Sequence, residues 1–205
     1  MRSSWILGGA IVAVGLMATG CGAPSGPNQR WSSPPALTIN ESQTYTAVVD
    51  TNYGSFTMNL FAKKSPITVN NFVFLAKHDF YNGDTFFRII KNFMIQTGSP
   101  SNNGQGGPGY TIKDELPPEV PYTAGVVAMA NTGAPNSGGS QFFICTVNDA
   151  QQLSPTYTEL GKVTSGMNVV EKIASIPVVA NPSMGGELSK PTKKAYIKNI
   201  TINVS

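Results

Sequence analysis

The sequence predicts a mainly β domain, folded as a closed antiparallel β-barrel and accompanied by two α-helices. Short strand-like runs are separated by many turns, since the chain carries 21 Gly and 15 Pro among its 205 residues. Only two segments show the apolar spacing that is typical of a helix. Short strands with glycine-rich connections and two isolated helices favour a barrel. The length fits one domain with appendages.

The first two strands are predicted at 44–50 and 56–61, with the turn residues 52–55 between them. Both runs are rich in β-branched and aromatic residues and are bounded by Asn, Gly and Ser, which is the usual pattern of a hairpin. The other strand-like segments follow the first helix and continue to the end of the chain: 86–96, 110–113, 125–130, 141–147 and 196–204.

Ser65 and Pro66 predict the start of the first helix, because serine is a good N-cap and proline suits the first helical position. His78 lies near the end of this helix, where a positive charge interacts favourably with the helix dipole. A second short helix is predicted over 167–174. The apolar stripe of the first helix consists of Val69, Phe72, Val73, Leu75 and Ala76.

The N-terminus has the pattern of an export signal. Arg2 supplies a positive charge, and residues 5–17 form an apolar stretch that is too short for a comfortable transmembrane helix. Small residues at 18–20 precede Cys21, which resembles the cleavage site of bacterial lipoproteins, although Ala18 stands where leucine is usual. The alternative is an ordinary signal peptide followed by an incidental cysteine.

This resemblance implies three segments: a signal peptide over 1–20, a flexible tether over 21–43 and a folded domain over 44–205. The tether is predicted from its Pro, Ser, Gly and Asn content. Lipidated Cys21, carrying palmitate, would anchor the protein to the cell membrane on its extracytoplasmic side. Without lipidation the protein would be secreted.

Composition and isolated residues argue against several function classes. The net charge is only +3, and the longest basic runs are the pairs Lys63–Lys64 and Lys193–Lys194, so nucleic-acid binding has no support. The single histidine, His78, predicts no metal site. The glycine-rich loop 98–109 lacks the ending of a phosphate-binding loop. Cys145, in a strand-like run, is interpreted as a small buried hydrophobic residue.

The stretch 86–96 is the most informative part of the chain, because it places a permanent cation, Arg88, inside an apolar strand-like segment. An unpaired charge on a buried face costs several kcal/mol. Arg88 is therefore paired with a carboxylate such as Asp84 or Glu115, turned to solvent, or part of a functional pocket. The residue alone leaves these alternatives open.

The motifs that decide between them lie in four blocks: Phe86-Phe87-Arg88-Ile89-Ile90-x-x-Phe93-Met94-Ile95-Gln96, Met129-Ala130-Asn131, Gly139-Ser140-Gln141-Phe142-Phe143-Ile144-Cys145 and Gly161-Lys162-Val163-x-x-Gly166-Met167. In order and spacing they resemble the cyclophilin family of peptidyl-prolyl cis–trans isomerases. The resemblance covers residues 45 to 205. It implies an eight-stranded antiparallel barrel with a helix over each end, no cofactor and no metal.

The resemblance also implies roles for individual residues. Arg88 matches the catalytic arginine of the family, and Tyr157 stands where the family has a pocket histidine. The walls of the proline pocket match Phe93, Met94, Phe143 and Leu153, and the groups that hold the substrate backbone match Gln96, Ala130, Asn131 and Gln141. Taken singly, each apolar residue is better interpreted as core, and the two glutamines could be ordinary surface amides. Taken as one ordered constellation, these residues favour the functional interpretation.

Proline isomerisation suits these residue types. Rotation about the peptide bond has a barrier of about 18–20 kcal/mol, and the two X–Pro isomers differ by only about 0.5–1 kcal/mol. A catalyst must bind the twisted amide better than either planar form. Arg88 can donate to the prolyl nitrogen, whose lone pair is freed by twisting, because arginine stays charged and offers several donors. A non-catalytic module that only binds proline segments is the alternative.

Two departures from the family concern the far wall of the groove. Gln151 or Gln152 stands where a tryptophan important for the drug cyclosporin is common, so weak cyclosporin binding is expected. Tyr157 keeps an aromatic wall and a hydroxyl donor in place of histidine. The expected partners are proline-containing segments of exported proteins and, through Cys21, the membrane; a monomer is assumed.

Overall fold

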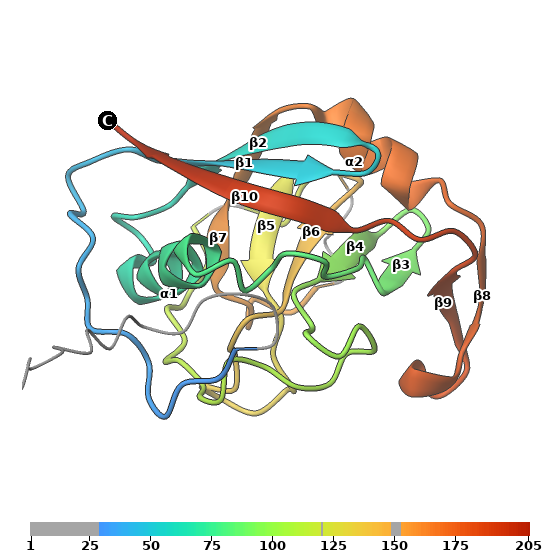
Figure 1. Cartoon of the computed structure of the whole chain (residues 1–205), viewed down its shortest axis with the longest axis horizontal. Coiled ribbons are helices and arrows are strands. Elements are labelled where there is room, and N and C mark those ends of the chain that lie inside the picture. The colour runs from blue at the N-terminus through green and yellow to red at the C-terminus, as the bar shows by residue number, and fades with distance from the viewer. Residues whose placement is uncertain (1–28, 120, 149–152) are drawn as a thin grey trace, which may run out of the picture.

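The computed structural model describes residues 29–119, 121–148 and 153–205. Over these residues, eight antiparallel strands form one sheet in the order β10-β1-β2-β7-β5-β6-β4-β3 (Figure 1). The strands of this sheet are β1 Tyr45–Thr51, β2 Gly54–Leu60, β3 Arg88–Ile90, β4 Met94–Thr97, β5 Val126–Met129, β6 Phe142–Cys145, β7 Glu159–Ser165 and β10 Ile197–Val204.

The prediction of a closed barrel is wrong: the sheet curves into a half-barrel whose two edge strands, β3 and β10, are not joined by a ladder in the described chain. The edges meet only where residues 83–86 approach 195–197, through the isolated bridge Thr85–Tyr196 and three backbone hydrogen bonds. The physical reason is that β3 is three residues long and lies beside a separate hairpin, which occupies the place of a closing strand.

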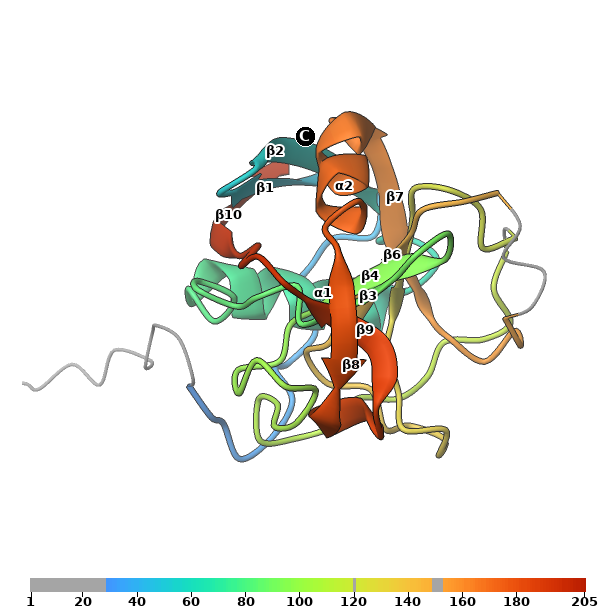
Figure 2. The same ribbon diagram turned by 90° about the vertical axis from the view of Figure 1, so that its right-hand side faces the viewer.

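That hairpin was not predicted. It pairs β8 (Val178–Asn181) with β9 (Glu187–Pro191) around the 3₁₀ turn Pro182–Met184, and it projects from the sheet (Figure 2). Strands β3, β4 and β7 also differ from the predictions, as does one segment that was expected to be a strand. The expected strand at 110–113 is reduced to the bridge between Ile112 and Gly138, β7 was missed, and the long segment 86–96 divides into β3 and β4.

The outer strands and the central strands are buried differently. In β1 every second residue is buried, as expected for a sheet with one face on the core. In β4, β5 and β6 every residue is buried. One face of these strands packs into the main core, while the other face carries a second, smaller apolar cluster that includes Met94, Phe143 and Cys145. This second cluster places apolar side chains on the outside of the half-barrel.

Both predicted helices are confirmed. Helix α1 spans Pro66–Lys77 and packs its apolar stripe into the main core, and α2 spans Met167–Ala174. Ser65 occupies the N-cap position of α1, but its side chain makes no capping hydrogen bond. Instead the Glu115 carboxylate accepts from the backbone N–H groups of Ile67 and Thr68 at 3.0 and 2.9 Å. A distant carboxylate thus supplies the charge that the first turn favours.

Residues 29–43, the described part of the predicted tether, run along the surface of the domain (blue in Figure 1). The backbone N–H of Trp31 donates to the carbonyl of Pro108 at 2.8 Å, and the Trp31 ring packs edge-on against Phe74 at 5.1 Å between centroids. The side chain of Asn70 accepts from the backbone of Thr38 and donates to the carbonyl of Ala36. This surface segment, residues 29–43, is called the strap below.

The predicted signal peptide and Cys21 lie outside the described residues, so the boundaries at 20 and 43 stay predictions. Within the part of the chain that the structure describes, no helix has both the length and the apolar character needed to span a membrane.

Candidate active site

A groove of about 1040 Å³ lies on the outer face of β4, β5 and β6, over the second apolar cluster. The structure brings together all of the substrate-site residues that the sequence predicted, from five separate stretches of the chain: Arg88, Phe93, Met94, Gln96, Ala130, Asn131, Gln141, Phe143, Leu153 and Tyr157. The glycine-rich segment 104–111 forms the opposite side of the groove.

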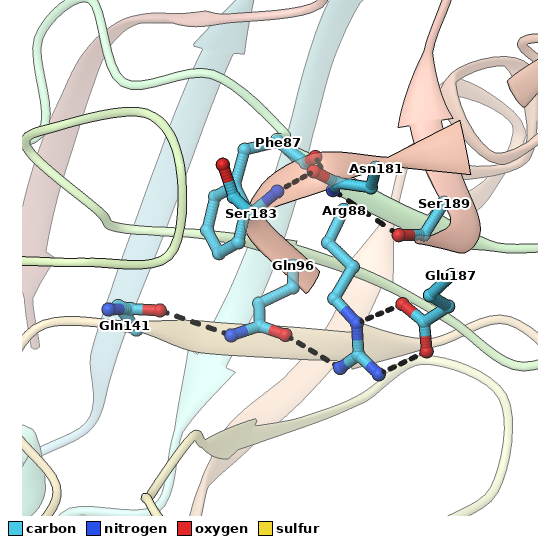
Figure 3. Close-up of polar contacts among 8 residues, drawn as sticks. All are labelled: Phe87, Arg88, Gln96, Gln141, Asn181, Ser183, Glu187 and Ser189. Atoms are coloured by element: carbon cyan, nitrogen blue, oxygen red, sulfur yellow. Dashed lines mark hydrogen bonds and ion pairs between the residues drawn. The ribbon is translucent and has the colours of Figure 1, made fainter. Parts of the chain in front are cut away.

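Arg88 enters the groove from β3, where it stands opposite Gln96 of β4. Its partner is neither of the expected carboxylates. Nε and Nη2 of Arg88 donate to the two carboxylate oxygens of Glu187 at 2.7 and 2.8 Å (Figure 3). Asp84 is instead buried and forms no ion pair with Arg88, and Glu115 caps helix α1. The β8–β9 hairpin therefore supplies the counter-charge.

A chain of side-chain hydrogen bonds continues from the guanidinium across the groove floor (Figure 3). Nη1 of Arg88 donates to Oε1 of Gln96 at 3.0 Å, and Nε2 of Gln96 donates to Oε1 of Gln141 at 3.1 Å. Nε2 of Gln141 in turn donates to the carbonyl of Gly104 at 2.9 Å. Each glutamine is thus fixed in one amide orientation, and neither is an ordinary surface amide.

The donors left on Arg88 can be counted. A guanidinium carries five N–H groups, and three of them are used by Glu187 and Gln96. One N–H on each terminal nitrogen therefore remains for a substrate. The side chain is only partly buried, with 27% of its surface exposed, so these donors are within reach of a bound peptide.

The apolar part of the groove is a pocket with one buried and one exposed side. Met94 and Phe143 are 2% and 5% exposed and form the inner wall, while Phe93, Leu153 and Tyr157 are partly exposed. The Tyr157 ring stands edge-on to Phe143, at 5.3 Å between centroids. Such a pocket buries an apolar ring against aromatic walls.

Tyr122, which was not predicted, fixes this wall from behind. Its hydroxyl donates to the carbonyl of Tyr157 at 2.7 Å and accepts from the backbone N–H of the same residue at 3.0 Å. Burial raises the pKa of Tyr122 to about 12, so the hydroxyl keeps its proton and its donor role. The backbone of Tyr157 is therefore held in place.

Ala130 and Asn131 follow β5 at the rim of the groove. The Ala130 N–H donates to the carbonyl of Gln141 at 2.9 Å. The Asn131 side chain donates to the carbonyl of Thr156 and accepts from the N–H of Gly133, at 2.9 and 3.0 Å. These bonds fix the rim against the loop that carries Tyr157.

The comparisons with known proteins agree with this geometry. The family described as cyclophilin type peptidyl-prolyl cis-trans isomerase/CLD matches residues 46–202. This chain belongs to the cyclophilin family. It is similar to peptidyl-prolyl cis-trans isomerase-like 1 of Aspergillus fumigatus, with 44% identity over 133 residues, which are 63% of this chain and 81% of the relative. The human peptidylprolyl isomerase domain and WD repeat-containing protein 1 is 42% identical over 77% of this chain and 24% of its own length.

Solved structures of this family have the same fold. A cyclophilin type isomerase from Cryptosporidium parvum superposes with a TM-score of 0.70 at 32% identity, covering 78% of this chain and 98% of the other. A second crystal structure of that protein, obtained in the presence of the dipeptide Ala-Pro, gives a TM-score of 0.69. The chain is a cyclophilin-type peptidyl-prolyl cis–trans isomerase.

Glu187 is the carboxylate that balances the charge of Arg88 in the cyclophilin groove. Its hydrogen bond with Arg88 lowers the pKa of this carboxyl below the usual 4.5, with a smaller contribution from Ser189. Because the folded-state pKa is lowered, the ion pair is present at neutral pH and is lost only as the pH falls below about 4.5.

Cys145 does not line the described groove. Cys145 is free and fully buried, and burial raises the pKa of its thiol to about 12, so the nucleophilic thiolate is not formed near neutral pH. The described residues contain no cluster of His, Cys, Asp or Glu that could hold a metal ion.

The sequence did not predict Glu187 as the partner of Arg88, because Glu187 lies on the unpredicted β8–β9 hairpin. Asn181 links this hairpin to the sheet, since its side chain donates to the carbonyl of Phe87 and to the hydroxyl of Ser189, at 3.4 and 3.3 Å. Its side-chain oxygen also accepts from the N–H of Ser183, which closes the hairpin turn (Figure 3). No spacing rule connects Glu187 with Arg88, so only the fold reveals the pair.

Proposed function

We propose that this cyclophilin accelerates X–Pro rotation in exported proteins and thereby assists their folding outside the cytoplasm. The observation that supports the chemistry is the partly exposed guanidinium of Arg88 beside an apolar, aromatic-walled pocket. The N-terminal pattern that ends at Cys21 supports export and a lipid anchor on the cell membrane.

In this proposal each group has one task. The pocket of Met94, Phe143 and Tyr157 holds the proline ring, and the groups around Gln96 and Gln141 hold the flanking backbone. Arg88 then donates one of its two free N–H groups to the prolyl nitrogen. That nitrogen is a good acceptor only when the amide is twisted, so the hydrogen bond stabilises the transition state more than either planar isomer.

The strap limits how far the proposed lipid anchor on Cys21 can lie from the groove. Because the backbone of Trp31 is bonded to Pro108, only residues 22–30 separate Cys21 from the domain surface. Whatever its conformation, the ten-residue step from Cys21 to Trp31 reaches at most roughly 36 Å, at about 3.3–3.6 Å per residue. A lipid on Cys21 would therefore keep the groove close to the membrane surface, where exported chains emerge.

Replacing Arg88 by alanine tests the chemistry. We expect kcat for a proline tetrapeptide to fall by two orders of magnitude or more, measured by magnetisation-exchange spectroscopy on the full-length protein in mild detergent. Circular dichroism and the melting temperature establish that the variant is folded. If a folded Arg88→Ala protein isomerises the peptide as fast as wild type, the assignment of Arg88 is wrong.

The cellular part of the proposal needs a separate test. Metabolic labelling with radioactive palmitate should label the wild-type protein and leave the Cys21→Ser variant unlabelled, and the wild type should pellet with the membranes. An unlabelled wild-type protein, or one that stays in the cytoplasmic fraction, would contradict the lipid anchor or the export. Refolding of exported proline-containing proteins in cells that lack this chain would then show whether folding assistance is its role.

A further inference from the structure

The strap brings a second arginine to the groove. Arg30 precedes Trp31 and is one of the residues that line the cavity, together with Pro108, Gly109 and Tyr110 of the opposite wall. It lies outside residues 46–202, which match the cyclophilin family. The family fold therefore does not supply this residue, and its place depends on how the strap is held.

Trp31 holds the strap firmly at this point. Its ring contacts three aromatic side chains at the end of helix α1, with centroid distances of 5.1 Å to Phe74, 5.8 Å to His78 and 6.1 Å to Phe80. Its backbone passes so close to Gly109 that a Cβ there would lie 2.4 Å from the Trp31 carbonyl oxygen. The backbone of Arg30 is therefore held beside the groove by its packed neighbour Trp31.

The charge of the groove is unbalanced. Of the two cationic residues that line it, Arg88 has its counter-charge in Glu187, whereas Arg30 is exposed and forms no ion pair within the described residues. None of the residues that line the groove is Asp or Glu. A bound peptide therefore meets one uncompensated positive charge, next to the wall of residues 107–110.

We propose that Arg30 determines specificity, and that it favours proline-containing segments with an acidic side chain close to the proline. This inference rests on the isomerase activity proposed for the groove and adds the class of preferred substrate. Arginine suits the role because its planar fork can bind a carboxylate through two hydrogen bonds. Because Arg30 is exposed, the gain is that of a surface ion pair, about two- to fivefold in kcat/KM.

The test compares peptides that differ in one charge. Glu, Gln and Lys are placed in turn at each of the three positions before and after the proline, and kcat/KM is measured by exchange spectroscopy with full-length protein in mild detergent. For wild type we expect the ratio of Glu to Gln peptide to reach about two to five at one or more positions. Raising the salt concentration to about 1 M should bring this ratio close to one, because salt screens exposed charges.

Substitutions of Arg30 and Trp31 test whether Arg30 causes the preference for the Glu peptide. Arg30→Gln should abolish the preference, Arg30→Lys should retain most of it, and Arg30→Glu should make the Lys peptide the better substrate. Trp31→Ala should weaken the preference by releasing the strap. The matched control is Lys198→Gln, which removes an exposed positive charge from β10 and should leave the Glu-to-Gln ratio unchanged.

Two results would overturn the inference: a wild-type ratio near one at every position, or a preference that persists in Arg30→Gln. Loss of the preference in Lys198→Gln to the same extent would also overturn it, because net charge alone would then be responsible. These failures differ from a failure of the isomerase itself, in which no peptide, including the neutral one, would be accelerated by the wild-type protein.

Discussion

The carboxylate of Glu187 binds the guanidinium of Arg88 through two hydrogen bonds of 2.7 and 2.8 Å, although 99 residues separate them in the sequence. The bond to Gln96 on the other side leaves the guanidinium little freedom to rotate. A donor that must reach a transient lone pair benefits from such fixation, because no reorganisation is needed during the reaction. We therefore propose that Glu187 acts as a positioning residue for Arg88.

Replacing Glu187 by alanine should lower kcat/KM by about tenfold, mostly through kcat, since a lost charge-assisted hydrogen bond is worth about 1.5–3 kcal/mol and this pair is partly exposed. Glu187→Asp should recover part of the rate. The wild-type rate should also fall as the pH drops below about 4.5, because the lowered pKa of Glu187 keeps the pair intact above that range. Exchange spectroscopy across pH 3.5–7 measures both effects.

The control for this prediction is Glu171→Gln, which removes an exposed carboxylate from helix α2. It should change neither the rate nor its pH dependence. The positioning role would be refuted if Glu187→Ala kept the wild-type kcat, or if its acid limb coincided with that of wild type.

Gln96 offers a test of whether the hydrogen-bond chain acts through Arg88. Gln96→Leu removes the acceptor of Nη1 and the donor to Gln141, and we expect a loss of about tenfold in kcat. In the Arg88→Ala background the same substitution should have almost no further effect on kcat, because neighbours that act through one residue are not additive. Full additivity of the two losses in kcat would show that Gln96 contributes to the rate independently of Arg88.

The parts of the fold that depend on local signals were predicted from the sequence. Helix α2 begins and ends at the predicted residues, and the strands β1, β2 and β10 lie within a few residues of their predicted bounds. Here the apolar period is regular and the turn residues are explicit. The members of the groove were predicted through motifs whose order and spacing are specific, and they do line one cavity.

The parts that the sequence did not reveal depend on contacts between distant segments. The strand β8 (Val178–Asn181) has only four residues, exposes Val179 and Ala180, and shows no apolar–polar alternation, so it carried no strand signal. The closing of the barrel was expected from short strands with glycine-rich connections and from the family resemblance, but the short β3 lies beside the β8–β9 hairpin instead of β10. The strap, rich in Pro and Ser, has the composition of a linker and yet lies on the domain because of contacts around Trp31 and hydrogen bonds to Asn70.

Gly109→Ala tests how tightly the strap is held. Gly109 has a φ of +98° and Gly133 a φ of +87°, so alanine strains the backbone at both positions by about 1–2 kcal/mol. Only at Gly109 would the new Cβ meet the strap, 2.4 Å from the Trp31 carbonyl oxygen, whereas nothing lies within 4 Å at Gly133. Urea unfolding should therefore show a clearly larger loss for Gly109→Ala than for the matched Gly133→Ala. Equal losses would mean that the strap yields at no cost.

Cyclosporin sensitivity tests the prediction that Gln151 or Gln152, both outside the described residues, replaces the family tryptophan. A glutamine offers neither the aromatic surface nor the indole donor of tryptophan, so the drug should inhibit this cyclophilin only weakly. Gln151→Trp or Gln152→Trp should increase the sensitivity at whichever position corresponds to the family tryptophan. An inhibition titration of the wild type that gives ordinary cyclophilin sensitivity would contradict this expectation.

Asp84 predicts an unusual dependence of stability on pH. The residue is 3% exposed, one of its carboxylate oxygens has no hydrogen-bond partner, and burial raises its pKa from 3.8 to about 7. Between these two values the folded protein binds more protons than the unfolded chain, so the free energy of unfolding decreases as the pH rises. Above pH 7 a buried, poorly solvated carboxylate persists in the folded state and destabilises it.

Asp84→Asn should therefore raise the melting temperature by about 5 °C at pH 8 and by much less at pH 5, since the amide stays neutral at both values. The matched control is Asp79→Asn, at an exposed position on the same turn, which should change the melting temperature equally little at both pH values. Calorimetry at pH 5 and pH 8 measures the difference. If Asp84→Asn shifts the melting temperature by the same amount at both pH values, its carboxyl is ionised throughout this range and the proposed pKa of about 7 is wrong.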